Sequence, residues 1–139
     1  MIHELVESFR HALLDELNEA DFVDAELSSF PYGSCEITSH MLGIFLESKG
    51  ISKVVITRNS RDDSIHYWVV VDNKLIIDLT AHQFSDSESN CIVTEHSSFH
   101  GKYNRIEEFK PNHWFLKRCG SLYGYTLFYD NIVKRLERI

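Results

Sequence analysis

A cysteine, a histidine and an aspartate in three separate segments have the side-chain types of a thiol-dependent catalytic site. Cys35 follows a loop rich in Pro, Gly and Ser and stands at the predicted start of a helix, while His66 and Asp78 lie in two successive predicted strands. A thiol becomes a strong nucleophile when it is ionised, and the positive end of a helix and a nearby imidazole both favour the thiolate. A carboxylate behind the imidazole fixes its tautomer and stabilises its positive charge. These residues predict attack of Cys35 on a carbonyl carbon, with His66 as base and Asp78 as its orienting group.

Each of the three residues also has a plainer interpretation. A single cysteine at a helix start is more often a small buried residue, and a histidine in an apolar strand is more often a core residue. Asp78 is harder to explain in this way, because it interrupts the apolar run Leu75–Leu79. A carboxylate buried there needs charged or hydrogen-bonding partners. The catalytic hypothesis therefore depends on the three residues taken together.

Three short motifs occur in a fixed order between residues 30 and 84. They are Phe30-Pro31-Tyr32-Gly33-Ser34-Cys35, Ile65-His66-Tyr67-Trp68 and Ile76-Ile77-Asp78-Leu79-Thr80-Ala81-His82-Gln83-Phe84. This set resembles small papain-like and transglutaminase-like cysteine enzymes. Within that superfamily it is most similar to the glutamine deamidase domain at the C-terminus of the Pasteurella multocida toxin and its bacterial relatives. Tyr67 stands where those relatives usually have a small residue, and His82 replaces an acidic residue that they often have.

The resemblance implies a triad of Cys35, His66 and Asp78 that hydrolyses an amide through a thioester, and it favours a glutamine side chain of a protein or peptide as substrate. Gln83 is a candidate oxyanion donor or a strand-end hydrogen-bonding residue. The N–H groups at the helix start, next to Ser34, are further candidate oxyanion donors. Trp68 is a candidate aromatic residue of the core or of the cleft wall. This mechanism needs no cofactor.

The residues themselves leave several alternatives open. The same triad suits a cysteine peptidase, a transglutaminase or an acyl transferase, which differ only in the group that accepts the acyl chain. A non-catalytic protein-binding module that keeps the fold is also compatible with the acidic composition and the many aromatics near the C-terminus. The rate at which each cysteine is alkylated distinguishes the enzyme from the binding module.

Helical and strand patterns are segregated along the chain. Apolar residues recur every three or four positions in three segments, which predicts helices. These segments are residues 2–19, 34–49 and 122–139. Runs of β-branched and aromatic residues predict strands at residues 53–57, 65–71, 74–79 and 91–94. The order predicts a single α+β domain over residues 1–139, with helices packed on an antiparallel sheet, and the resemblance implies a papain-like or transglutaminase-like core. No element is predicted in residues 95–120.

The hairpin between the second and third predicted strands decides whether His66 and Asp78 can meet. With a two-residue loop at Asp72-Asn73, Asp78 would oppose Tyr67 and point to the opposite face of the sheet from His66. A site that uses both side chains requires them on one face. We therefore predict a loop of odd length or a β-bulge between residues 70 and 78.

The composition excludes several classes of protein. Apolar residues make up 43% of the 139 residues, which is ordinary for a globular chain. The net charge of −7 argues against a nucleic-acid partner. The longest strongly apolar run, Tyr67–Val71, is far shorter than the roughly 20 residues that cross a bilayer, so we expect no membrane partner. Three cysteines and the absence of a secretory signal pattern predict a cytoplasmic location, or delivery into a target cell without such a signal.

A zinc site is the competing candidate among the Cys and His residues. Cys91, His96 and His100 form a C-x4-H-x3-H pattern, and His113 and Cys119 follow. Strong zinc signatures contain a C-x2-C pair, which this segment lacks. We therefore predict that these histidines are solvated loop residues and that the chain has no metal site.

Overall fold

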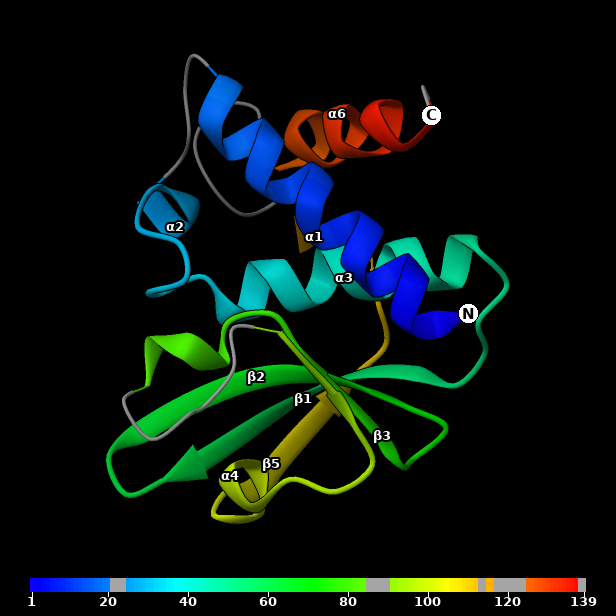
Figure 1. The fold of residues 1–139 in the computed structure, drawn as a ribbon. Coiled ribbons are helices and arrows are strands. Elements are labelled where there is room, and N and C mark those ends of the chain that lie inside the picture. Colours follow the sequence, from blue (N-terminus) through cyan, green and yellow to red (C-terminus); the bar gives the residue numbers. More distant parts are fainter. Residues whose placement is uncertain (21–24, 85–90, 113–114, 117–124, 138–139) are drawn as a thin grey trace.

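The computed structural model describes residues 1–20, 25–84, 91–112, 115–116 and 125–137, and it has an α+β fold (Figure 1). The helices are α1 (Ile2–Glu19), α2 (Ala25–Ser28), α3 (Cys35–Ser48), α4 (Ser98–Gly101) and α6 (Thr126–Glu137), with a 3-10 turn η1 at Ala81–Gln83. The strands are β1 (Val54–Arg61), β2 (Ser64–Val71), β3 (Leu75–Asp78), β4 (Ile92–Thr94) and β5 (Asn104–Phe109). Within the described residues they form an antiparallel sheet in the order β4-β3-β2-β1-β5. The predicted fold class is confirmed.

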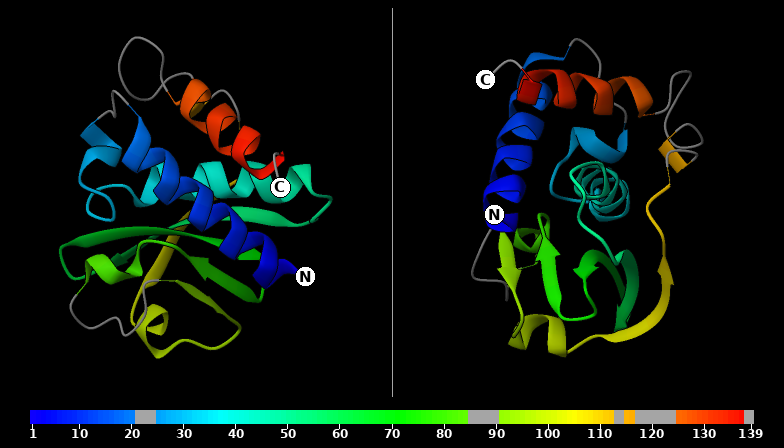
Figure 2. Two further views of the ribbon diagram at one scale, coloured as in Figure 1. Left: turned by 45° about the horizontal axis from the view of Figure 1, so that its top comes forward. Right: turned by 90° about the vertical axis from the view of Figure 1, so that its right-hand side faces the viewer.

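Helix α3 is the central helix of the fold. It lies between the sheet and α6, and α1 runs along its side (Figure 2). Every residue from Ile37 to Leu46 is buried, as expected for a helix that is covered on all sides. Gly43 permits the close approach of the segment after β5, because a Cβ there would lie 2.9 Å from Pro111 Cγ. Gly50, with φ of +84°, follows the helix end in the left-handed conformation that glycine adopts readily.

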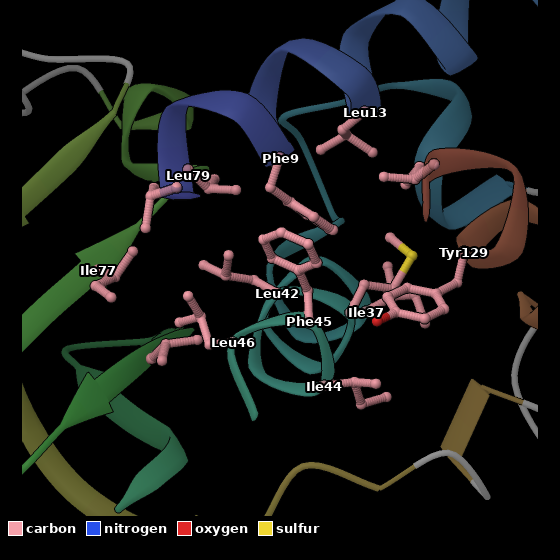
Figure 3. Close-up of a cluster of buried hydrophobic side chains, with 14 of the residues drawn as sticks. Phe9, Leu13, Ile37, Leu42, Ile44, Phe45, Leu46, Ile77, Leu79 and Tyr129 are labelled. Atoms are coloured by element: carbon pink, nitrogen blue, oxygen red, sulfur yellow. The ribbon is translucent and has the colours of Figure 1, made fainter. Parts of the chain in front are cut away.

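The two faces of the sheet carry separate apolar clusters. On β2, Val69 and Val71 belong to the main core beneath α1, α3 and α6, part of which is drawn in Figure 3. The alternate residues Trp68 and Val70 belong to a second cluster with Phe99 of α4 on the other face. This period of two is expected for a strand that is buried on both sides. His66 lies on the same face of β2 as Trp68, so its side chain points toward the second cluster.

The β2–β3 hairpin has the odd-length loop that the site requires. Val71 pairs with Leu75, so the loop consists of the three residues Asp72, Asn73 and Lys74. Asp72 and Asn73 both have φ of 55°, a conformation that Asp and Asn adopt more readily than most residues. One step beyond the last pair of this register, Asp78 lies level with Trp68 and on the same face as His66. The prediction of an odd loop is confirmed.

The structure differs from the sequence-based assignment mainly in residues 95–120, where no element is predicted. This region contains α4 and β5. Strand β1 continues to Arg61, well beyond the predicted end at Thr57, because it pairs with β2 and β5 over its polar half. The predicted loop before α3 contains the short helix α2. In the described part of the chain, no helix combines the length and apolar character needed to cross a membrane.

Candidate active site

Asp78 is the centre of a buried hydrogen-bond network. Its Oδ2 accepts hydrogen bonds from His66 Nε2 at 2.6 Å and from His100 Nε2 at 2.7 Å. Its Oδ1 accepts from the backbone N–H of Thr80 at 2.9 Å and from the Thr80 hydroxyl at 3.3 Å. Burial alone would raise the pKa of Asp78, but the hydrogen bonds from His100 and His66 hold it well below its usual range. Asp78 is therefore a fixed negative charge in the protein interior.

His66 is the residue whose charge state Asp78 controls. Its side chain is fully buried. Burial lowers its pKa, but the hydrogen bonds to Asp78 and to Cys35, together with the charges of both groups, raise the pKa to about 9. Because Nε2 is bonded to Asp78, the other ring nitrogen, Nδ1, is left for the reacting side of the site. The side-chain amide nitrogen of Gln83 lies 3.4 Å from Nδ1.

Cys35 is the first residue of α3 and a free, partly buried cysteine. Its side chain is one of the groups that raise the pKa of His66. The preceding residue, Ser34, occupies the N-cap position, but its hydroxyl does not cap the helix. It donates instead to the carbonyl oxygen of Pro31 at 3.0 Å. The first-turn N–H groups of α3 have no acceptor within the helix, so they and the positive helix end favour negative charge at this position.

His100 is the site residue that the sequence analysis misplaced. It is buried, not a solvated loop histidine, and its Nε2 bonds to Asp78 from α4. Its Nδ1 lies 2.6 Å from the hydroxyl of Ser97, which also accepts a hydrogen bond from the His100 backbone N–H at 3.1 Å. Ser97 thus caps α4 and orients the imidazole. The Ser-x-x-His spacing is a signal for a capped turn, but nothing in it indicates that the turn reaches Asp78.

Aromatic rings enclose the two histidines. Trp68 is buried, with its ring centroid 4.5 Å from that of His100 and 5.5 Å from that of His66. The other rings around His66 belong to Phe84, Phe99 and Tyr103. Trp68 is thus an aromatic of the core that walls the histidine pair. Such a surrounding keeps water from the His66–Asp78 bond and strengthens its electrostatic attraction.

His66, Asp78 and His100 are also the residues that could hold a metal ion, since one ligand atom from each lies within 4.8 Å of the others. Two ligand atoms at about 2.1 Å from a tetrahedral zinc lie about 3.4 Å apart. Both histidine nitrogens lie 2.6–2.7 Å from the same carboxylate oxygen, which is hydrogen-bond length. The spacing fits shared protons and is too short for a shared ion.

The predicted C-x4-H-x3-H set does not converge in the described part of the chain. Cys91 and His96 belong to no such ligand group there. Burial and the neighbouring Glu7 raise the pKa of Cys91 to about 12, so its thiol resists ionisation. His113 and Cys119 lie outside the described residues.

Comparison with known proteins gives no match: no family model fits the chain, and no curated protein or solved structure is significantly similar to it. The resemblance to papain-like and transglutaminase-like enzymes therefore stays a prediction from three motifs.

Proposed function

We propose that the protein is a thiol-dependent amide hydrolase with Cys35 as nucleophile, His66 as general acid and base, and Asp78 as the group that orients His66. The observation that carries this proposal is the buried 2.6 Å bond between His66 Nε2 and Asp78 Oδ2, on a histidine whose pKa is also raised by Cys35. A structural ion pair would need no thiol beside it. A histidine that serves as the base for a thiol nucleophile has the thiol as its second partner.

The first half of the reaction forms a thioester. The Cys35 sulfur attacks the amide carbonyl carbon, a C–S bond forms, and the negative charge moves to the carbonyl oxygen. The uncapped N–H groups at the start of α3 are suited to stabilise that oxygen. The C–N bond then breaks as His66, protonated at neutral pH, passes its proton to the leaving nitrogen. Ammonia or an amine departs.

The second half regenerates the Cys35 thiolate. His66, now neutral, accepts a proton from a water molecule that attacks the thioester carbonyl. The C–S bond breaks, the carboxylic acid leaves, and the thiolate recovers its imidazolium partner. The overall change is one amide and one water converted to one carboxylic acid and ammonia or an amine. Asp78 stays ionised throughout because four hydrogen-bond donors hold its charge.

A glutamine side-chain amide is the substrate that we propose. The three motifs from Phe30 to Phe84 support this choice, because they resemble a glutamine deamidase domain. Cleavage of a peptide bond and transfer to an amine acceptor use the same first half and are the alternatives to be separated by assay. The primary assay uses a short acetylated glutaminyl peptide, with ammonia release and a mass gain of about 1 Da as readouts.

The activation of Cys35 can be tested without a substrate. We expect iodoacetamide to alkylate Cys35 at pH 6–7 at a rate far above that of an ordinary thiol, because the thiolate is the reactive form. Cys91 is a control within the same chain, since the high pKa of its thiol keeps it protonated in this range. Mass spectrometry of tryptic peptides gives the rate for each cysteine separately.

His66→Asn is the matched variant for this experiment. It retains a hydrogen-bonding side chain but cannot hold the proton, so we expect the fast phase of Cys35 labelling to disappear near pH 7. Equal and slow labelling of Cys35 and Cys91 in the unmodified protein would contradict the proposal. That result would favour a protein-binding module.

A further inference from the structure

A pocket of about 360 Å³ opens beside the residue that follows Cys35. Its walls are Glu36 and His40 of α3, residues 109–112 at and after the end of β5, and Phe115. Glu36 and His40 are four residues apart and therefore lie on one side of the helix. The volume is at the lower end of the range for small-ligand sites. The pocket begins one residue from the proposed nucleophile.

His40 gives this pocket an unused hydrogen-bonding atom. The residue is 4% exposed, and its Nδ1 has no hydrogen-bond partner among the residues that the structure describes. Its ring stacks on Phe115, with centroids 3.9 Å apart and an interplanar angle of 16°. Burial lowers the pKa of His40 to about 4, so the imidazole is neutral at physiological pH. Buried polar atoms are nearly always paired, and a bound ligand would supply the missing partner.

Glu36 connects the pocket to the thiol. Burial raises the pKa of its half-buried carboxyl, while a hydrogen bond with Tyr67 and the charge of Arg58 act in the opposite direction. The charge of Cys35 in turn contributes to raising the pKa of Tyr67. Glu36 lines the pocket and directly follows Cys35 in α3, so the pocket and the thiol belong to adjacent residues of one helix.

The lining indicates the chemistry of the ligand. Among the described lining residues, the carboxylate of Glu36 and the ammonium group of Lys110 carry opposite charges, so the lining favours neither an anion nor a cation. Phe109, Pro111 and Phe115 supply apolar and aromatic surface, against which a ring can pack offset or edge-on. The neutral imidazole of His40 can hydrogen-bond to a peptide N–H group or carbonyl.

We propose that this pocket binds a large uncharged side chain, aromatic by preference, of a peptide substrate whose neighbouring glutamine presents its amide to Cys35. The inference rests on the proposed function, because it places the substrate relative to that thiol. It adds what the triad cannot specify, namely which sequences around a glutamine the protein selects.

Peptides that carry an electrophile in place of the glutamine amide test the selection. We suggest acetylated dipeptides with 6-diazo-5-oxonorleucine at the glutamine position and Phe, Leu, Ala or Asp before it. The sulfur of Cys35 would displace dinitrogen from the protonated diazoketone, so the adduct reports one productive encounter. We expect labelling to be at least tenfold faster with Phe than with Ala, and slowest with Asp.

A blocked pocket and a matched control make the interpretation specific. Asn112 is exposed at the rim, and Asn112→Trp should fill the entrance and reduce the preference for Phe over Ala to less than twofold. Glu47→Trp places the same side chain on an exposed position near the other end of α3 and should keep the preference. Equal rates with all four peptides in the unmodified protein would overturn the inference.

Binding can be followed separately from reaction in the Cys35→Ala protein. Titration with N-acetyl-phenylalanyl-glutamine amide should shift the ¹⁵N signal of His40 Nδ1, and the alanyl analogue should shift it far less. If iodoacetamide labels Cys35 rapidly but no shift occurs, the pocket inference fails and the proposed function stands. If His40 responds while Cys35 is labelled no faster than Cys91, the proposed reaction fails and the pocket stands.

Discussion

Two buried histidines in this protein differ in charge at neutral pH: His66 is protonated and His40 is neutral. His66 is fully buried and His40 is 4% exposed, and burial lowers the pKa of both. The pKa of His40 falls to about 4, whereas that of His66 is raised to about 9 by its bonds to Asp78 and Cys35. Burial alone therefore does not decide the charge of a histidine. The charge is decided by the hydrogen-bonding and charged groups around the ring. Of these two histidines, His66 has partners that keep it protonated at neutral pH.

The difference originates in the elements that carry the two residues. His66 lies on β2 beside β3, and the odd hairpin loop brings Asp78 to the same face of the sheet. His40 lies in the middle of α3, where its neighbours are the rings of Phe115 and Phe109. Aromatic rings lie beside both imidazoles, but a carboxylate reaches that of His66 and none of the described carboxylates bonds to that of His40. We interpret the first as acid–base machinery and the second as part of a binding wall.

The largest expected effect follows from Asp78→Asn, which removes the negative charge that gives His66 a much higher pKa than His40. The pKa of His66 should fall well below 9, because burial still lowers it and the bond and charge of Cys35 are left to raise it. Labelling of Cys35 at pH 7 should slow by up to about 30-fold, because a thiol that returns to the free pKa of about 8.5 is only about 3% ionised at this pH. Titration of the imidazole NMR signals and the alkylation rate measure the two effects.

Asp63→Asn is the control for this variant, since Asp63 is an exposed aspartate in the β1–β2 turn. It should change neither the pKa of His66 nor the labelling rate. The pKa of His40 should stay near 4 in both variants. A His66 that still titrates near 9 without the Asp78 charge would contradict the assigned cause.

Titration of His66 and of His40 should also destabilise the protein, at the alkaline and at the acid end of the pH range respectively. The raised pKa of His66 gives stability that is fully present below pH 6.5 and is lost as the pH rises through 9. The lowered pKa of His40 gives stability that is present above pH 6.5 and is lost as the pH falls toward 4. Each shift corresponds to about 3 kcal/mol. Urea denaturation between pH 4 and pH 10 measures the free energy of unfolding.

His40→Phe isolates the acid side of this dependence, because a phenyl ring keeps the stack on Phe115 and cannot bind a proton. The loss of stability between pH 6.5 and pH 4 should be smaller in this variant by about 3 kcal/mol. The alkaline side should be unchanged. An identical acid dependence in the variant and the unmodified protein would show that His40 titrates normally.

Local sequence patterns predict much of this fold, because several elements have a strong apolar period. The spacing in residues 2–19 and 34–49 indicates α1 and α3 to within a residue of their ends. Whether the hairpin loop has an odd or an even number of residues is also predictable. His66 and Asp78 must lie on one face of the sheet, and this requirement predicts the odd loop that the structure has. These features depend on residues that are close in the chain, which is where sequence patterns carry information.

The missing parts of the prediction depend on contacts between distant segments. Strand β5, with the sequence NRIEEF, is an edge strand with mostly exposed side chains, so it has no buried alternation to detect. His100 is 22 residues from Asp78 along the chain, and only the position of α4 beneath the sheet brings them together. The sequence analysis predicted a solvated His100, because histidine spacing alone does not reveal a hydrogen-bond partner.

His100→Gln tests how far the second histidine supports the first. Without the Nε2–H group of His100, Asp78 loses one of its four hydrogen-bond donors and is held less firmly against His66. We expect Cys35 labelling at pH 7 to slow about tenfold, as for other groups that orient a functional histidine. The pKa of His66 should not fall, because the carboxylate charge is shared with fewer donors. This combination separates a positioning role from a charge effect.

The control for this variant is His96→Gln, which changes an exposed histidine near the same short helix. It should leave the labelling rate unchanged. A fall in the pKa of His66 in His100→Gln comparable to that in Asp78→Asn would mean that His100 sets the charge of the site, and the positioning role would be wrong.

Ser97→Ala should have the smallest effect, because Ser97 acts on Asp78 and His66 through His100. The variant removes the bond to His100 Nδ1 and the cap of α4, at a cost of about 1 kcal/mol in the free energy of unfolding. Thermal denaturation should show a Tm lower by about 3 °C, with Ser98→Ala, an exposed neighbour, as the control. Cys35 labelling should slow less than in His100→Gln, because the His100–Asp78 bond remains. Equal slowing in the two variants would mean that the hydroxyl of Ser97 fixes the His100 ring, and that the support of Asp78 starts in the α4 turn.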